Sequence, residues 1–215
     1  MLDPKIAVLL KEMRPGAHVV LVYDSPEHKR DVLFNHLKFG INASKLAYVC
    51  SEEPPQQVEE EMHDFGIDVE GLEQSGMLSV GNYDEVYIRD NKVDVHGIID
   101  HFSDLAWRCT KSGLKGLRAS AEMSCFFRHD KVNELITYED ALHREFAFPG
   151  MGICAYNVLE MQKSGHLGML MPLLRAHSRV ILTGPLGSSI LEPERLDENH
   201  IERMMKVDMW ARSKS

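Results

Sequence analysis

Short apolar runs of strand length recur along the chain, and helical patterns lie between them. The runs VVLVY and LAYVC are continuously apolar rather than alternating, as expected for strands that are covered by helices on both faces. Alternation of strands with helices predicts an α/β fold with a mostly parallel central sheet. The predicted strands are residues 18–24, 45–51, 77–81, 117–123, 152–157 and 179–184.

Helix signals fill the gaps between these runs. Asp3 and Pro4 form a cap and first turn, Ser25 and Pro26 start a second helix, and Pro54 precedes a third that Gly66 ends. A stripe of apolar residues at helical spacing predicts a further helix, and residues 130–146 predict another. The stripe consists of Ile98, Phe102, Leu105 and Cys109.

Two segments are less regular. Residues 82–93 are predicted to form a hairpin or an excursion from the sheet, and residues 184–193 are predicted to be a loop. A charged helix follows, with Leu196, Ile201, Met204, Met205 and Trp210 along it. We therefore expect one sensory domain over residues 1–184 and a C-terminal segment, 185–215, that packs on the domain or on a partner.

Composition excludes several classes of protein. The 215 residues carry a formal net charge of −9, which would repel a nucleic-acid backbone. No stretch approaches the roughly 20 apolar residues that a membrane span needs, and no signal peptide is evident. The four cysteines are widely spaced, without a CxxC pair, so neither a disulfide framework nor a zinc ribbon is indicated. We expect a cytoplasmic protein that contacts neither nucleic acid nor membrane.

Ligand sites in parallel α/β sheets lie outside the carboxyl ends of the strands. Polar and titratable residues follow several of the predicted strands, and Cys154 and Tyr156 lie on the fifth. These candidate ligand-binding residues are Tyr23, Asp24, Ser25, His28, Ser51, Glu52, Glu53, Glu122, Ser124, Cys154 and Tyr156.

Two resemblances cover most of the chain. Residues 48–80, YVCSEEPPQQVEEEMHDFGIDVEGLEQSGMLSV, resemble the segment of KaiC-type ATPases that includes paired glutamates. The segments HVVLVYDSPEH, GLRASAEMSCFF and FPGMGICAYN resemble the MEDS domain, a sensory domain named for methanogens, methylotrophs and the dichloromethane regulator DcmR. The resemblance implies a RecA/KaiC-like fold and sensing of hydrocarbon derivatives linked to one-carbon metabolism.

The phosphate-binding loop of KaiC-type enzymes is not present after the first strand. That loop needs bare backbone N–H groups and a lysine, whereas this chain has DSPEHKRD. Pro26 has no N–H, and Glu27 places negative charge where a phosphate would lie. Lys29 and Arg30 are expected on a solvated helix face. We therefore predict no functional Walker A motif and no ATPase activity.

Three acidic residues correspond to the ATPase machinery of the resembling family. Glu52 and Glu53 match glutamates that activate the attacking water, although Glu53 is equally explained as a helix cap. Glu122 matches the group that holds magnesium, and Arg118 or Arg128 would be a purely structural partner for its carboxylate.

The helix predicted over residues 130–146 has an acidic residue within its apolar face. Glu139 shares that face with Val132, Leu135 and Leu142, and His143 follows a turn later. The pair Tyr138-Glu139 also matches the MEDS pattern. An acid in this setting indicates either a salt bridge or a ligand contact.

No metal and no cofactor are predicted. The eleven histidines form no HExxH or HxH motif, and clusters in space are not visible in a sequence. Cys50 and Cys154 are interpreted either as redox-sensitive thiols or, more commonly, as buried structural residues.

These observations favour a regulatory domain that binds a small, weakly polar molecule and passes the signal to a protein effector such as a kinase or transcription regulator. One alternative is an enzyme that grips a nucleotide through Lys29, Arg30, Glu52 and Glu122. Another is a ligand-free interaction subunit, without a cavity of roughly 300 Å³ near Tyr23, Ser51 and Glu122. We expect a homodimer.

Overall fold

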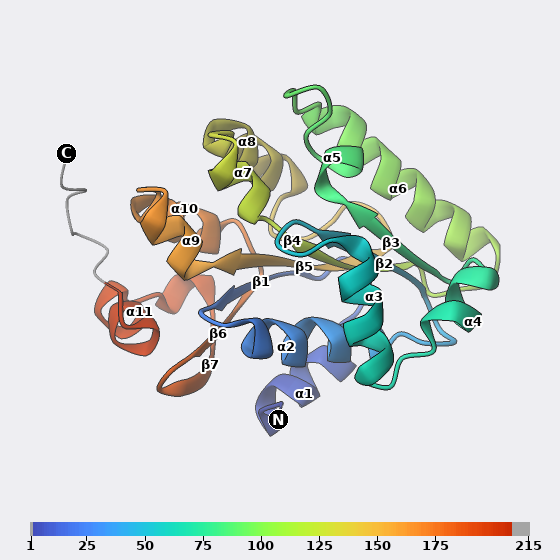
Figure 1. Cartoon of the computed structure of the whole chain (residues 1–215), viewed down its shortest axis with the longest axis horizontal. Helices are drawn as coiled ribbons and strands as arrows, with labels where there is room; N and C mark the ends of the chain where they lie inside the picture. The colour runs from blue at the N-terminus through green and yellow to red at the C-terminus, as the bar shows by residue number, and fades with distance from the viewer. Residues whose placement is uncertain (1, 208–215) are drawn as a thin grey trace.

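The computed structural model describes residues 2–207, which form one seven-stranded sheet with helices on both faces (Figure 1). The strand order is β3-β2-β4-β5-β1-β6-β7, and neighbouring strands from β3 to β6 are parallel. The strands are β1 (His18–Tyr23), β2 (Lys45–Cys50), β3 (Leu78–Asn82), β4 (Leu117–Glu122), β5 (Gly150–Asn157), β6 (Arg179–Gly184) and β7 (Gly187–Leu191). The predicted fold class and the six predicted strands are confirmed.

Helices cover both faces of this sheet. The face drawn below the sheet in Figure 1 is covered by α1 (Pro4–Glu12), α2 (Pro26–Lys38), α3 (Pro55–Asp64) and α4 (Val69–Gln74). The other face is covered by α5 (Tyr83–Val86), α6 (Val95–Lys111), α7 (Ser124–Arg128), α8 (Val132–Leu142), α9 (Val158–Lys163), α10 (Leu170–Arg175) and α11 (Glu198–Met205), with short 3₁₀ turns at Leu167–Met169 and Pro193–Arg195.

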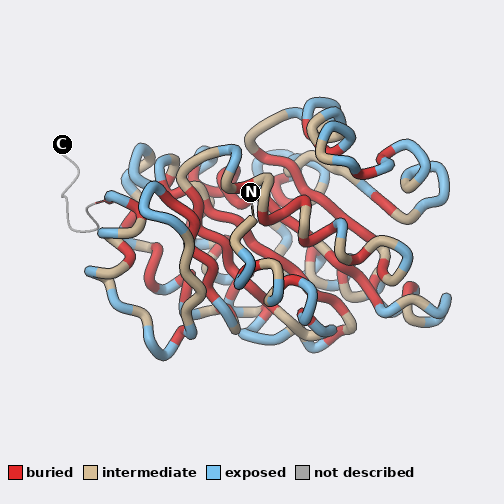
Figure 2. Tube along the Cα trace, turned by 90° about the horizontal axis from the view of Figure 1, so that it is seen from below, coloured by how far each residue is buried: buried red, intermediate tan, exposed pale blue. Residues whose placement is uncertain are grey.

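The core consists of two apolar layers, one on each face of the sheet. Every residue of β1 is buried, which explains its continuously apolar sequence. Val20 and Val22 belong to the layer under α6 to α11, whereas Val19 and Leu21 belong to the layer over α1 to α4. Figure 2 shows the buried strands in the middle and exposed turns on the outside.

Local sequence signals set where several of these elements begin. The carboxylate of Asp3 accepts the N–H of Lys5 at the start of α1, and the hydroxyl of Ser25 accepts the N–H of His28 at the start of α2. Gly116 precedes β4 with φ of +123°, and a Cβ there would lie 1.8 Å from the carbonyl oxygen of Pro149. Only glycine therefore allows β4 to run this close to the start of β5.

Three sequence-based boundaries differ from the structure. Residues 184–193 are not simply a loop, because β7 pairs antiparallel with β6 across the two-residue turn of Pro185 and Leu186. Residues 82–93 begin with the short helix α5, and only then make a tight turn between Arg89 and Lys92. The helix predicted to reach residue 146 ends at Leu142, because the next residue, His143, has φ of +59°.

The C-terminal helix α11 packs against β6. Ile201 and Met205 are buried in the same apolar layer as Leu182 of β6, while Trp210 lies outside the described residues. Among residues 2–207, none of the helices is both long and apolar enough to span a membrane.

Candidate functional site

The carboxyl ends of β1, β2 and β4 carry a buried polar group that we call the Lys29 cluster. It contains one ammonium, three carboxylates and the polar side chains that bind them. Its members are Lys29, Glu52, Glu53, Glu122, Tyr23, Tyr48, Ser124 and Asn157.

The ammonium of Lys29 is the centre of this cluster, and its side chain is only 1 % exposed. Nζ lies 2.8 Å from Oε1 of Glu122, 2.5 Å from Oε2 of Glu53 and 3.3 Å from Oε2 of Glu52. Burial alone would lower the pKa of Lys29, but the carboxylates of Glu122 and Glu52 outweigh that effect and raise the pKa above its ordinary value. The lysine is therefore a charged group held inside the fold.

The expectation that Lys29 lies on a solvated helix face is wrong. Lys29 lies on the buried face of α2, together with Val32, Leu33 and His36. Spacings of three, four and seven residues place all four side chains on one side of a helix. Arg30 lies outside this face, where its guanidinium pairs with Glu61 at 3.2 Å.

Glu122 is completely buried, and its carboxylate is bound by groups of α2, of β2 and of the turn after β2. Besides Lys29, its carboxylate accepts the hydroxyl of Tyr48 at 2.5 Å and the backbone N–H groups of Ser51 and Glu52 at 2.7 and 2.8 Å. The prediction that Arg118 is the structural partner of Glu122 is wrong, because the Arg118 guanidinium donates to backbone carbonyls of α1 and α2 instead. The other predicted partner, Arg128, is exposed.

Glu52 connects the ends of β1, β5 and α7. Its Oε1 accepts hydrogen bonds from the hydroxyl of Tyr23 at 2.6 Å, the hydroxyl of Ser124 at 2.7 Å and the amide of Asn157 at 3.1 Å. Burial would raise the pKa of Glu52, but Lys29 and these donors outweigh it and lower the pKa. Burial instead raises the pKa of Glu53. Glu53 pairs with Lys29 and does not cap α3, whose cap is Pro54.

Asp24, Ser25 and His28 lie beside the Lys29 cluster, at the N-terminus of α2. The ring of His28 bonds to the carboxylate of Asp24 at 2.6 Å, and Ser25 is the cap of the helix. Their polar atoms are thus engaged within the first turn, where a phosphate-binding loop would instead present free N–H groups.

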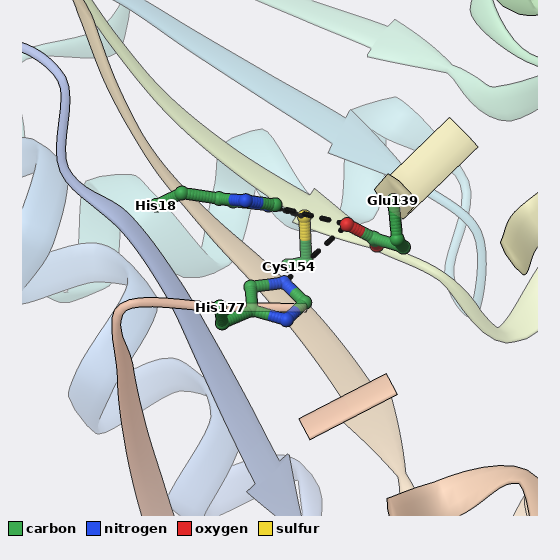
Figure 3. A group of neighbouring side chains, drawn as sticks. All are labelled: His18, Glu139, Cys154 and His177. Atoms are coloured by element: carbon green, nitrogen blue, oxygen red, sulfur yellow. Dashed lines mark hydrogen bonds and ion pairs between the residues drawn. The ribbon is translucent and has the colours of Figure 1, made fainter. Parts of the chain in front are cut away.

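A second buried group lies on the opposite face of the sheet, and we call it the histidine cluster. It consists of His18, Glu139, Cys154 and His177 (Figure 3). Oε2 of Glu139 lies 3.2 Å from Nε2 of His18 and 3.4 Å from Nε2 of His177, and Sγ of Cys154 lies 3.5 Å from Nε2 of His18. The four side chains come from β1, α8, β5 and the turn before β6, and all four residues are buried.

The partners around the histidine cluster fix the direction of each side chain. Nδ1 of His18 lies 2.7 Å from the carbonyl of His143, and Nδ1 of His177 lies 2.8 Å from the carbonyl of Leu173. The other carboxylate oxygen of Glu139, Oε1, accepts a hydrogen bond from the hydroxyl of Tyr156. Burial raises the pKa of the Cys154 thiol well above its ordinary value.

Two further pKa shifts follow from this burial. Burial lowers the pKa of His177 to about 3, with nearby His18 acting in the same direction. For Glu139, burial would raise the pKa, but His177 and His18 outweigh it and lower the pKa to about 2.

An apolar cavity of about 40 Å³ lies between the sheet and the helices α6 and α8. Its lining includes Phe102, Tyr138, Phe146, Phe148, Ala119 and Cys154. Since one water needs roughly 10–15 Å³ measured in this way, the cavity has room for a molecule of only a few heavy atoms. Cys154 belongs to both the cavity wall and the histidine cluster. The ligand pocket was expected near Tyr23, Ser51 and Glu122, but that region is occupied by the contacts of the Lys29 cluster. This filling is what the alternative of a ligand-free interaction subunit predicts.

The sequence matches the family model described as the methanogen/methylotroph, DcmR sensory domain, MEDS, over residues 17–178. This match covers more than half of the chain. The chain belongs to the MEDS family.

Solved structures share the fold of this MEDS domain at low sequence identity. An uncharacterised Pyrococcus horikoshii protein, crystallised with an unknown peptide, aligns with a TM-score of 0.60 and 14 % identity over 89 % of this chain and 91 % of its own. The flagellar accessory protein FlaH from Methanocaldococcus jannaschii aligns with a TM-score of 0.56 and 14 % identity, over 89 % and 85 % of the two chains. A KaiC-like protein from Pyrococcus horikoshii gives 0.46 and 14 %, over 78 % and 71 %. No curated protein matches the sequence.

The MEDS domain separates the predicted site residues into two groups. Tyr23, Ser51, Glu52, Glu53, Glu122 and Ser124 gather at the Lys29 cluster, with Asp24, Ser25 and His28 beside it. Glu139 and Cys154 belong to the histidine cluster, and Tyr156 donates to Glu139 from beside it. Sequence reasoning missed Tyr48 and Asn157 in the first group and His18 and His177 in the second, and it named Lys29 only as a solvated residue or as a nucleotide contact. A lysine within the apolar face of α2 was a usable signal for Lys29, while the two histidines are far apart in sequence and carried none.

Proposed function

We propose that this MEDS domain is a regulatory sensor that binds a very small, weakly polar molecule and does not hydrolyse ATP. The observation that carries this proposal is the apolar cavity between β4, β5, α6 and α8. An apolar site with a few polar groups at its wall suits a small hydrocarbon derivative. The name of the family supports a sensory role, and the size of the cavity favours a ligand of one or two carbon atoms.

Three features support the absence of ATPase activity. Pro26 has no N–H with which to bind a phosphate, and Lys29 already pairs with three carboxylates. A triphosphate seated at the start of α2 would also meet the negative charge of Glu52 and Glu53. In the resembling ATPases, the corresponding carboxylates act on water and magnesium, whereas here they neutralise an internal lysine.

Two assignments extend this proposal to partners. We assign residues 1–184 to the sensory domain and residues 185–215 to a C-terminal segment whose β7 and α11 pack on that domain, and we propose a separate effector such as a kinase or transcription regulator. Exposed apolar side chains such as Trp107 and Leu186 offer contact area for an effector or for a second copy of the chain. One structural neighbour was crystallised with an unknown peptide, which supports including peptides among the partners to be tested.

The cavity is tested with two small probes, dichloromethane and methanol, by NMR titration of the purified chain. We expect at least one probe to shift signals of residues around Ala119 and Cys154, and Ala119→Leu to abolish the shifts by filling the cavity. Ala7→Leu, in α1 on the opposite face of the sheet, is the matched control and leaves binding unchanged. Binding of neither probe, or equal binding to Ala119→Leu, would contradict a ligand site in this cavity.

Calorimetry with ATP and Mg²⁺ tests the remaining part of the proposal. We expect neither measurable heat of binding nor release of phosphate. Micromolar binding with turnover would establish the alternative enzyme, which grips a nucleotide by other means.

A further inference from the structure

We propose that the histidine cluster is a binding site for one divalent transition-metal ion of the zinc class, held by His18, Glu139, Cys154 and His177. This inference concerns a different function from the small-molecule site and does not rest on it. It follows from the directions of the four side chains, their spacing and their charge.

The directions of the two imidazole rings come first. A carbonyl oxygen can only accept a hydrogen bond, so Nδ1 of His18 and Nδ1 of His177 each carry the hydrogen that they donate to His143 and Leu173. A neutral imidazole then has a bare lone pair on Nε2. Both Nε2 atoms point at the same carboxylate oxygen of Glu139. Two lone pairs and an anionic oxygen repel one another unless a cation lies between them.

Unpaired polar atoms support this interpretation. Among residues 2–207, Oε2 of Glu139 and Nε2 of His177 are buried without a hydrogen-bond partner. Polar atoms buried in this way cost free energy unless something binds them, and a buried carboxylate costs most. Both atoms face the interior of the cluster, where a shared ion would satisfy them together.

Three of the six separations between the ligand atoms match those of a tetrahedral site. Bonds of about 2.0–2.1 Å from zinc to nitrogen or oxygen, and about 2.3 Å to sulfur, imply ligand separations of about 3.3 Å and about 3.6 Å. The observed separations from Oε2 of Glu139 to the two Nε2 atoms are 3.2 and 3.4 Å, and that from Sγ of Cys154 to Nε2 of His18 is 3.5 Å. All four atoms lie within 4.8 Å of one another.

The surroundings also match those of metal ligands in proteins. Metal-binding histidines usually donate their second ring N–H to a backbone carbonyl or carboxylate, as His18 and His177 do here. Tyr156 binds the other oxygen of Glu139. A ligand set of two imidazoles, one carboxylate and one thiolate suits zinc, cobalt or iron rather than magnesium or calcium.

Charge balance gives the reaction that accompanies binding. The thiol of Cys154 loses one proton to solvent, and its thiolate and the carboxylate of Glu139 together carry two negative charges. Two neutral imidazoles and a divalent ion complete a site with no net charge. The buried cluster would then contain no unpaired ion.

Cobalt(II) substitution of the purified 215-residue chain tests the site, because cobalt bound to thiolate gives a charge-transfer band in the near ultraviolet. We expect one cobalt per chain with this band, competition by zinc and release of one proton per ion. We expect Cys154→Ser to remove the band. His177→Gln should weaken binding by at least about 10- to 100-fold, because that loss is typical even for a residue that only hydrogen-bonds to a metal ligand. The matched controls are Cys125→Ser and His36→Gln, which replace a buried cysteine and a buried histidine elsewhere and keep the band.

Three results would overturn the proposal. They are absence of stoichiometric cobalt or zinc in the wild-type chain, persistence of the band in Cys154→Ser, and NMR detection of a doubly protonated His18 in metal-treated protein, in which case the shared cation is a proton. If the ligand variants do not fold, X-ray absorption of the cobalt-loaded wild type decides the matter. It must show one sulfur and three nitrogen or oxygen neighbours, and any other set contradicts the site. Binding of dichloromethane or methanol without metal would leave the proposed function intact and remove only this inference.

Discussion

Tyr156 and Asn157 are adjacent in β5, yet their side chains bind glutamates in two different clusters. The hydroxyl of Tyr156 donates to Glu139, and the amide of Asn157 donates to Oε1 of Glu52 at 3.1 Å. Successive side chains of a strand point to opposite faces of the sheet, which explains the separation. The end of β5 therefore holds the two polar groups in a fixed relation, and a shift of this strand end would strain hydrogen bonds in both.

We predict that Tyr156→Phe destabilises the fold by about 1–3 kcal/mol. The substitution keeps the ring but removes the only hydrogen bond that Glu139 Oε1 accepts among residues 2–207, so a buried carboxylate oxygen loses its donor. The measurement is urea unfolding at pH 7. Tyr83→Phe removes a surface contact with His129 and should change the free energy of unfolding by less than about 0.5 kcal/mol. Equal effects of the two substitutions would contradict the described role of Tyr156.

Lys29→Met is expected to cost about 3–5 kcal/mol of stability at pH 7, since it leaves the buried carboxylate of Glu122 and the partly buried carboxylates of Glu52 and Glu53 without their shared ammonium. The loss should shrink as the pH falls toward 4, because without Lys29 burial raises the pKa of Glu52, and protonation then removes its unpaired charge. Lys5→Met, on the exposed side of α1, is the control and should be near neutral. A Lys29→Met protein as stable as the wild type would refute the importance of this lysine.

The buried ring of His36 makes stability depend on pH. Burial, followed by the charge of Arg118, lowers the pKa of His36 well below its ordinary value of 6.5, so the folded state keeps the ring neutral. The unfolded chain takes up a proton below pH 6.5. Stability should therefore fall as the pH drops below 6.5, by up to about 1.4 kcal/mol per pH unit from this group. His36→Gln should lose less stability between pH 6.5 and 5 than the wild type, whereas His63→Gln, which replaces an exposed ring, should follow the wild type.

His143→Gly should stabilise the chain by about 1 kcal/mol. His143 has φ of 59° and ψ of 176°, a backbone conformation that costs residues other than glycine about 1–3 kcal/mol. Its side chain is exposed. Glycine relieves this strain and offsets part of the gain through its greater freedom in the unfolded chain. Thermal unfolding provides the measurement. Asn133→Gly, in the first turn of α8, tests whether glycine stabilises irrespective of backbone angle, and we expect it to destabilise.

Most of the fold was predictable because burial of the sheet on both faces leaves continuous apolar runs in the sequence. The same rule explains why β7 was missed. Gly187, Ser188 and Ser189 lack the branched apolar side chains typical of strands, and β7 needs only the partner on one side that the turn after β6 supplies. The early end of α8 was also hidden, because no residue type marks the positive φ of His143.

The candidate site was predictable only in part. Residues at the ends of parallel strands were rightly expected to gather, and Glu52 and Glu122 do so. The expectation of one pocket failed because Tyr156 and Asn157 point to different faces, and because Lys29 folds inward between carboxylates. His18 and His177 meet only when β1 and β6 become neighbours in the sheet, and no sequence spacing records that pairing.

The buried Lys29 bears on which signal a domain with this site can respond to. An ATPase changes state as nucleotide binds and is consumed, whereas here the ammonium of Lys29 is already paired with three carboxylates of its own chain. On the proposed function, the output of the domain would follow the concentration of its small ligand and be indifferent to the energy supply of the cell.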